Sequence, residues 1–138
     1  MITELYCRLY VNSVSDEATL LQKIAKYIGG NVAMRSVSDA IMHIRLSKND
    51  TYLPNSISNR DEFVQYPYTA EVHPSHEIFE HIEPVEPGTY IDLVCEIITK
   101  LRQSGDLVVA SCDYEDLIVE KTGWNWSEKT PRHPPFSQ

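Results

Sequence analysis

The segment HPSHEIFEH, residues 73–81, holds three of the five histidines in the chain together with two glutamates. Histidine nitrogens and carboxylate oxygens are common zinc ligands, and zinc proteases place two histidines one helical turn apart in an H-E-x-x-H motif. Here His76 and Glu77 are followed by glutamate at position 80, and the histidine comes one place later. The reversed H-x-x-E-H motif fails as well, because histidine and glutamate stand in swapped order. The spacing therefore favours a polar surface turn, with no metal or other cofactor.

A metal site in this segment remains an alternative. If a helical turn forms, His76 faces Glu80 and Glu77 faces His81, each at a spacing of four residues. Two such pairs, with His73 nearby in the sequence, could hold a metal ion, but a catalytic zinc needs three convergent ligands and an open position. Metal analysis of protein purified without a histidine tag would test this possibility.

The other residue types that carry chemistry form no recognisable constellation. Cys7, Cys95 and Cys112 are an odd set without CxxC spacing, so they indicate neither a disulfide framework nor a zinc knuckle. We expect them to fill the core as small apolar side chains, although Cys112 stands beside Asp113 at the end of an expected strand, where nucleophiles do occur. Nucleotide-binding glycine motifs, the GxSxG motif and EF-hand loops are absent from the sequence. The sequence therefore predicts no catalytic residues and a protein that is not an enzyme.

Charge is distributed unevenly along the chain, whose net charge is −8. Residues 1–60 carry a balance of +2, residues 61–120 a balance of −12 and residues 121–138 a balance of +2. No lysine or arginine lies between Arg60 and Lys100. A one-signed acidic field repels phosphate backbones and attracts cations or a basic protein surface. These features predict that the chain does not bind nucleic acid.

Length and composition favour one soluble domain. A chain of 138 residues, 42% of them hydrophobic, is long enough to form one core. No apolar run reaches the length of a membrane span, and the first residues lack the pattern of a signal peptide. We therefore expect a cytoplasmic protein with no membrane partner and of unknown oligomeric state.

Periodicity predicts the elements of the first half. Residues 4–11 alternate between apolar and polar side chains, as in a half-buried strand. Ser15 is the expected N-cap of a helix whose apolar stripe runs to residue 28 and which ends at Gly29 and Gly30. Short strands are expected at 31–35 and 40–46, joined by a turn in SVSD, and an exposed loop is expected at 47–61.

The second half repeats a strand–helix–strand order. Residues 62–72 read as a strand with Tyr66 and Tyr68 on one face, and Pro67 within it indicates an edge position or a bulge. A long helix follows, with Thr89 as its expected cap and Gly105 at its end. Its expected buried face comprises Tyr90, Val94, Ile97, Ile98 and Leu101. LVVASC reads as a central strand, and DYEDLIVE reads as a cap at Asp113 and a short amphipathic turn.

This order predicts an α+β fold of two layers. Helices are expected on one face of a mixed, mostly antiparallel sheet, on a ferredoxin-like or related split βαβ plan with an added strand. The domain is expected to cover residues 1–120, followed by a tail, residues 121–138, that contains tryptophan and proline. Trp124 and Trp126 in this tail either cover the core, which is the commoner role, or bind a partner.

The segment VVASCDYEDLI, preceded by the helix YIDLVCEIITKLRQSG, resembles small bacterial immunity proteins of contact-dependent growth inhibition and other polymorphic toxin systems. In these proteins a strand runs into an acidic D-[FY]-E-D segment after an amphipathic helix. The resemblance covers about residues 62–120. It implies a protein that binds and neutralises a cognate toxin domain in the cytoplasm.

The acidic balance agrees with this expectation, because toxin domains that attack nucleic acid often have basic surfaces. A small-ligand sensor or binding domain on the same plan is the first alternative, and a metal-dependent enzyme that uses residues 73–81 is the second. The partner surface is expected to include seven acidic residues and two tryptophans: Asp113, Glu115, Asp116, Glu77, Glu80, Glu83, Glu86, Trp124 and Trp126.

Overall fold

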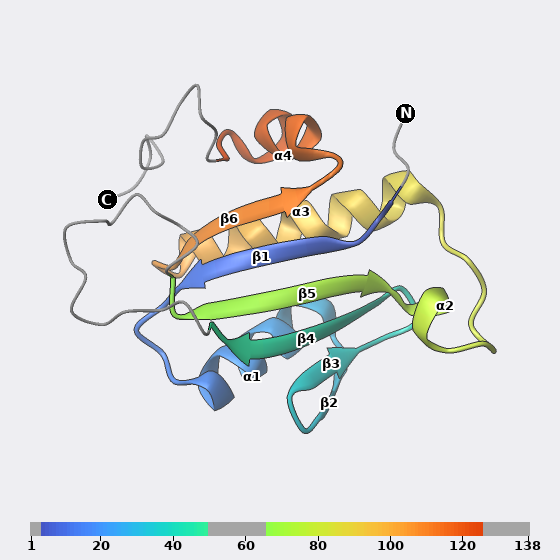
Figure 1. Ribbon diagram of the computed structural model, residues 1–138, viewed down its shortest axis with the longest axis horizontal. Coiled ribbons are helices and arrows are strands. Elements are labelled where there is room, and N and C mark those ends of the chain that lie inside the picture. The colour runs from blue at the N-terminus through green and yellow to red at the C-terminus, as the bar shows by residue number, and fades with distance from the viewer. Residues whose placement is uncertain (1–3, 50–65, 126–138) are drawn as a thin grey trace.

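Six strands form one antiparallel sheet in the computed structural model, which describes residues 4–49 and 66–125 (Figure 1). Their order across the sheet is β2-β3-β4-β5-β1-β6. All five neighbouring pairs are antiparallel, so the sheet is not mixed. The strands are β1 Cys7–Asn12, β2 Asn31–Ala33, β3 Ser36–Ser38, β4 Met42–Lys48, β5 Tyr68–Pro74 and β6 Leu107–Cys112.

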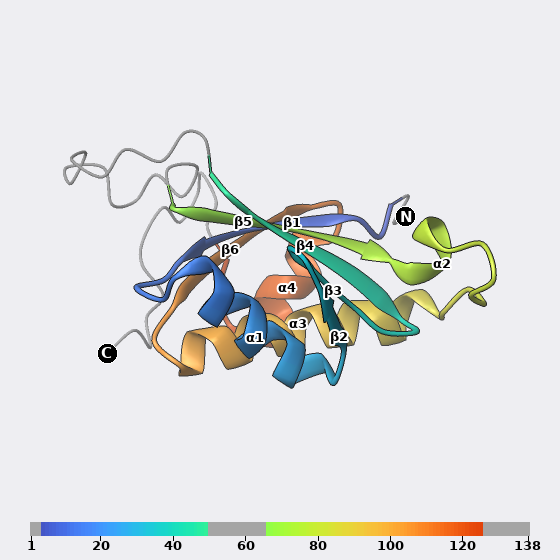
Figure 2. The same ribbon diagram turned by 90° about the horizontal axis from the view of Figure 1, so that it is seen from below.

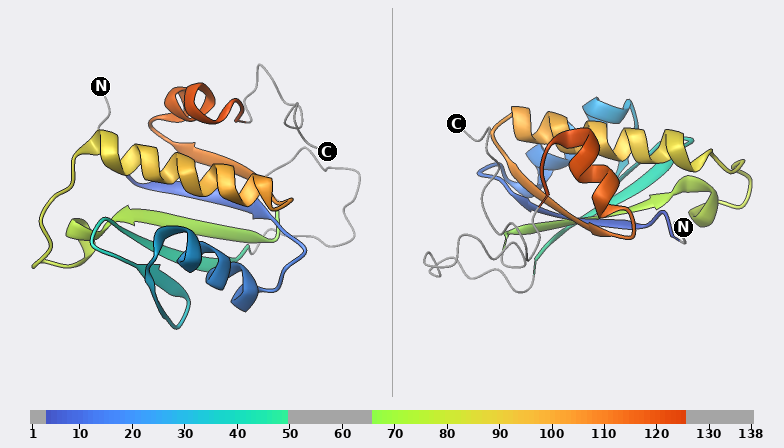
Figure 3. Two further views of the ribbon diagram at one scale, coloured as in Figure 1. Left: turned by 180° about the vertical axis from the view of Figure 1, so that it is seen from behind. Right: turned by 90° about the horizontal axis from the view of Figure 1, so that it is seen from above.

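The helices of the described residues lie on one side of this sheet or at its end. They are α1 Glu17–Ile28, α2 Ser75–Ile78, α3 Pro87–Gln103 and α4 Glu115–Thr122. α1 and α3 form the second layer (Figure 2). α4 packs beside α3 at the β6 edge, and the short α2 lies at the end of β5 (Figure 3). The predicted two-layer α+β sandwich is confirmed.

Four strands and two helices follow the ferredoxin-like plan. α1 lies between β1 and β4 in the chain, and β5 separates these two strands in the sheet. In the same way α3 connects β5 to β6, with β1 between them. Each unit is therefore a split βαβ, as predicted. The hairpin β2–β3 extends the sheet beyond β4, which is one strand more than the sequence indicated.

The main core lies between the sheet and the helices. From the sheet it takes side chains such as Leu9, Ile44 and Val72, all 0% exposed. The buried face of α3 contains all five residues expected there, together with Ile91, Cys95 and Arg102. The buried face predicted from the helical period of α3 is therefore confirmed.

A smaller apolar cluster covers part of the opposite face of the sheet. Tyr66, Val109 and Trp124 form this cluster, and each is at most 8% exposed. Asn125 follows and is 3% exposed. The folded domain therefore continues through α4 to Asn125, beyond the expected boundary at residue 120, and residues 126–138 lie outside the described part of the chain.

The helix caps differ from the sequence expectation. Asp16, not Ser15, caps α1, because its carboxylate accepts a hydrogen bond of 2.8 Å from the Thr19 backbone N–H. α3 begins at Pro87, two residues before the expected cap at Thr89, and its N-cap Glu86 makes no side-chain hydrogen bond. Proline at the first helical position needs no donor partner, so this helix begins without a capping side chain.

Two strand assignments were also wrong. SVSD is not a turn, because Ser36–Ser38 forms β3 and the tight turn lies at Met34 and Arg35, where Met34 has φ of 56°. β5 is a central strand, and Pro67 precedes it rather than lying in an edge strand. The missing N–H of Pro67 therefore removes no hydrogen bond within the strand. Tyr66 lies in the smaller cluster, whereas Tyr68 lies in the main core.

β6 was expected to be a central strand and is an edge strand. The sequence of β6 resembles that of a central strand because both faces of β6 are covered, one by helices and the other by the Trp124 cluster. Its outer edge is occupied by side chains rather than by another strand. The Asn125 amide accepts from Ala110 N–H at 2.9 Å and donates to Ala110 C=O at 3.0 Å, and Arg102 donates to Val108 C=O at 2.8 Å. These contacts protect the edge from pairing with another chain.

Candidate functional site

Two acidic segments lie at the same end of the sheet. β5 and β6 are both antiparallel to β1, so they run parallel to each other and end on the same side (Figure 1). The segment after β5 contains α2 and the connection to α3, with Glu77, Glu80, Glu83 and Glu86. The segment after β6 contains Asp113, Glu115 and Asp116. We refer to these seven residues as the acidic end.

The turn between β6 and α4 is held by its aromatic residue. Tyr114 is 2% exposed, and its hydroxyl donates a hydrogen bond of 2.8 Å to Leu5 C=O. Burial holds the pKa of the Tyr114 hydroxyl well above its ordinary value, so it remains a donor. Tyr114, not Asp113, is the N-cap of α4. The buried anchor leaves Asp113 and Asp116 exposed on either side of it.

Glu115 has a structural contact of its own. Its carboxylate accepts a hydrogen bond of 3.1 Å from Cys112 N–H, and its side chain is only partly exposed. A carboxylate in the first turn also suits the positive end of the helix dipole. Part of the Glu115 side chain therefore stabilises the turn.

Ser75 fixes the other acidic segment. Its side chain is 0% exposed, and its hydroxyl donates a hydrogen bond of 2.7 Å to Asp39 C=O. The Ser75 N–H donates to Ile41 C=O at 2.9 Å, which attaches the start of α2 to the connection before β4. The glutamates that follow Ser75 lie on α2 and on the connection from α2 to α3. Ser75 attaches the start of this segment to the rest of the fold.

Five carboxylates of the acidic end have no ion-pair partner among the described residues. Glu77, Glu80, Glu83, Glu86 and Asp116 are exposed, and none of them forms an ion pair with a described residue. The ion pairs of the described residues instead involve five other acids, on β5, on α1 and α3, and before β6. The acidic end therefore presents negative charge to the solvent.

The histidines of residues 73–81 do not converge. His73 lies within β5, with its ring centroid 4.8 Å from that of Tyr6. His76 lies in α2, and His81 follows the helix, with its ring 6.3 Å from that of Phe79. The expected pairs with Glu80 and Glu77 have no continuous helix to support them, because α2 ends at residue 78.

Among residues 4–49 and 66–125, no three His, Cys, Asp or Glu side chains lie together as a metal site. His73 has a neighbour in the sheet that the spacing of the histidines does not indicate. Its cross-strand neighbour is His43 of β4, whose ring packs edge-on against Phe79 at 5.7 Å. Strand register created this pair, and register was not readable from the spacing of the histidines.

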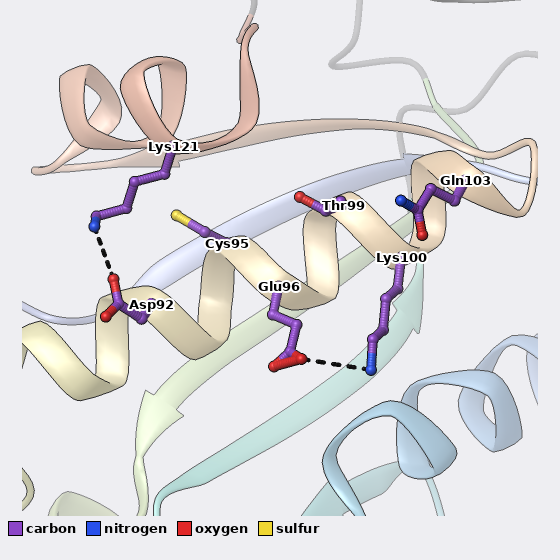
Figure 4. A pocket seen from close by; sticks show the side chains of 7 residues that line it. All are labelled: Asp92, Cys95, Glu96, Thr99, Lys100, Gln103 and Lys121. Carbon is purple, nitrogen blue, oxygen red and sulfur yellow. Dashed lines mark ion pairs between the residues drawn. The ribbon is translucent and has the colours of Figure 1, made fainter.

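An open groove of about 430 Å³ lies between α3 and α4 (Figure 4). Lys121 of α4 pairs with Asp92 of α3 at 2.8 Å, and Lys100 pairs with Glu96 at 3.5 Å. Cys95 lies in the floor of the groove and is 4% exposed, and burial raises the pKa of its thiol to about 11. The charged groups on the rim are matched to one another, and the thiol is not activated.

Of the two tryptophans expected on the partner surface, the structure describes Trp124. Trp124 is 8% exposed and packs its indole ring near the Arg102 guanidinium, at 5.2 Å. Burial lowers the pKa of Arg102 to about 10, so Arg102 keeps its charge at neutral pH. The position of Trp124 is that of a residue covering the sheet, which was the commoner of its two expected roles. Trp126 lies outside the described residues.

Comparisons of the chain with protein-family models, with curated proteins and with solved structures found no match. Among the described residues, no helix combines the length and the apolar character that a membrane-spanning segment needs.

Proposed function

We propose that this protein is an immunity protein, which binds a cognate toxin domain in the cytoplasm and blocks it. One observation carries the proposal. Two segments that are distant in the sequence place exposed, unneutralised carboxylates at the same end of one sheet. Such a surface complements a basic protein surface, which domains that cleave nucleic acid commonly have.

The way in which the two acidic segments are attached to the fold also supports this proposal. Tyr114 and Ser75 are buried and hydrogen-bonded to other elements, so each acidic segment starts from a fixed point. A surface that is formed before binding loses less conformational entropy when a partner docks. Binding alone suffices for this function, and no catalytic residue is required.

The first alternative, a small-ligand domain, needs an enclosed site with a few convergent polar groups. The groove between α3 and α4 is instead lined by side chains that pair with one another, Asp92 with Lys121 and Glu96 with Lys100. The second alternative needs three convergent metal ligands, and His73, His76 and His81 lie on different parts of the fold. Neither alternative is favoured by a specific contact.

The test uses the toxin domain encoded by a gene adjacent to that of this chain. Asp116→Lys with Glu83→Lys reverses one exposed charge in each acidic segment, while Glu115 keeps its contact with Cys112. Because electrostatic complementarity acts mainly on the encounter, this variant should associate about tenfold or more slowly at low salt, with a weaker salt dependence. Stopped-flow association at two ionic strengths measures both effects.

The matched control carries lysine at four exposed, uncharged positions away from the acidic end, which makes the same change in net charge: Asn12→Lys, Ala18→Lys, Gln22→Lys and Gln103→Lys. This control should slow association much less than the acidic-end variant. Equal slowing by both variants would attribute the effect to net charge alone. Unchanged association of the acidic-end variant at both ionic strengths would contradict the proposed surface.

A further inference from the structure

Cys7 of β1 and Cys112 of β6 are direct cross-strand partners in the sheet. Both are free thiols, and they are 105 positions apart in the sequence. Cys7 is 0% exposed, whereas Cys112 is partly exposed. The pair lies where β6 enters the turn of Asp113 and Tyr114, next to the acidic end.

The hydrogen bonds of β6 define the type of this pair. Ala110 directs its N–H and its C=O outward to the Asn125 amide, and the Cys112 N–H donates outward to Glu115. In an antiparallel strand the N–H and C=O of one residue point to the same side, so at Ala110 and Cys112 they point away from β1. Cys7 and Cys112 therefore form a non-hydrogen-bonded pair.

Such pairs bring the two backbones close. Their Cα atoms lie about 4.5 Å apart, and their side chains are nearer than in hydrogen-bonded pairs. Disulfides span Cα separations of about 4.4–6.8 Å. The two thiols lie close enough to influence each other, because Cys112 raises the pKa of Cys7 and Cys7 lowers the pKa of Cys112. The backbone spacing typical of such a pair therefore suits a disulfide.

We propose that Cys7 and Cys112 are a dithiol site that a small disulfide, such as glutathione disulfide, oxidises to an intramolecular cross-strand disulfide. The Cys112 thiolate attacks one sulfur of the small disulfide, and the other half leaves as a thiolate that takes up a proton. Cys7 then gives up its proton and attacks the Cys112 sulfur, which releases the second half as a thiol. In sum, two protein thiols and one small disulfide become one protein disulfide and two small thiols.

The order of attack follows from exposure and hydrogen bonding. Cys112 is the partly exposed thiol of the pair. The pKa of Cys112 is lowered mainly because its sulfur accepts the hydrogen bond from Cys7, and the pKa of Cys7 is raised by the same contact and by burial. Cys112 is therefore the entry point, and Cys7 is the resolving thiol.

The experiment exposes the folded full-length protein to glutathione disulfide and follows intact mass and peptide maps. The parent chain should lose the mass of two hydrogens and yield a peptide that links Cys7 to Cys112, and a thiol reductant should reverse both changes. Cys7→Ala should stop at one glutathione adduct on Cys112. Cys112→Ser should leave Cys7 unmodified, and Cys95→Ser should behave as the parent chain.

Three results would overturn the proposal. They are a parent chain that stays reduced, a parent chain that accumulates the glutathione adduct without closing the bond, and a link that contains Cys95. Because the map of the parent chain decides among these results, the conclusion does not depend on whether Cys7→Ala folds. Circular dichroism of each variant shows whether its thiols were tested in the folded state.

Discussion

At the scale of single residues, Asn125 has a contact that its sequence position did not indicate. Its side-chain amide satisfies both backbone groups of Ala110 on the outer edge of β6 and is itself 3% exposed. Asn125→Ala leaves two buried backbone groups without partners, so we expect the free energy of unfolding to fall by about 1–3 kcal/mol. Urea unfolding of the purified protein measures this change.

Asn12→Ala is the matched control, because Asn12 is exposed at the end of β1. Its effect should stay within about 0.5 kcal/mol. If both substitutions cost the same, the Asn125 amide does not stabilise the edge of β6.

His43 predicts a pH dependence of stability. Burial lowers its pKa from 6.5, and the neighbouring His73 and Arg45 add to the shift. Just below pH 6.5 the unfolded chain therefore binds more protons at this position than the folded protein does, so stability falls as the pH falls through this range. The contribution of His43 is complete above pH 6.5.

His43→Gln should reduce the difference between the urea midpoints measured at about pH 7.5 and about pH 5.5, because glutamine does not titrate. His81→Gln, at an exposed position, is the control and should leave that difference nearly unchanged. A difference that His43→Gln does not alter would assign the pH dependence to other groups.

At the scale of elements, α3 supplies much of the core between the helical layer and the sheet. Ile97 is 2% exposed and faces the sheet, whereas Gln103 is exposed on the same helix. Ile97→Ala removes buried apolar volume and should lower the free energy of unfolding by about 2–5 kcal/mol. Gln103→Ala should change it by less than about 0.5 kcal/mol. Chemical denaturation of both variants checks the assignment, and similar values would show that the buried face is misplaced.

The elements also show where sequence patterns are informative. α1 and α3 were predicted because a 3.6-residue apolar period is a local property of the chain. β3 and the central position of β5 were not predicted, because a strand of three residues and a neighbour in the sheet leave no comparable local pattern. Leu107–Cys112 has the apolar pattern of a central strand but lies at the edge of the sheet, because apolar residues on both faces indicate burial and not pairing.

At the scale of the whole molecule, the net charge of −8 predicts a response to salt. Raising the salt concentration from about 0.01 M to about 1 M shortens the screening length from about 30 Å to about 3 Å. Repulsion within the acidic end should then weaken, and the melting temperature should rise. The Asp116→Lys and Glu83→Lys variant should gain less from salt, because it begins with less repulsion. A melting temperature that falls with salt would mean that the ion pairs contribute more than the repulsion does.

The sequence by itself determined the α+β class, the buried face of α3, the concentration of acidic residues in 61–120 and the absence of known catalytic motifs. Each of these depends on composition or on local spacing. The tertiary structure alone decided that the two acidic segments share one end of the sheet, that His43 adjoins His73 and that Cys7 adjoins Cys112. These are contacts between residues far apart in the chain, and strand order and register set them. A strand pattern specifies which face of a strand is buried, but not which strand lies beside it.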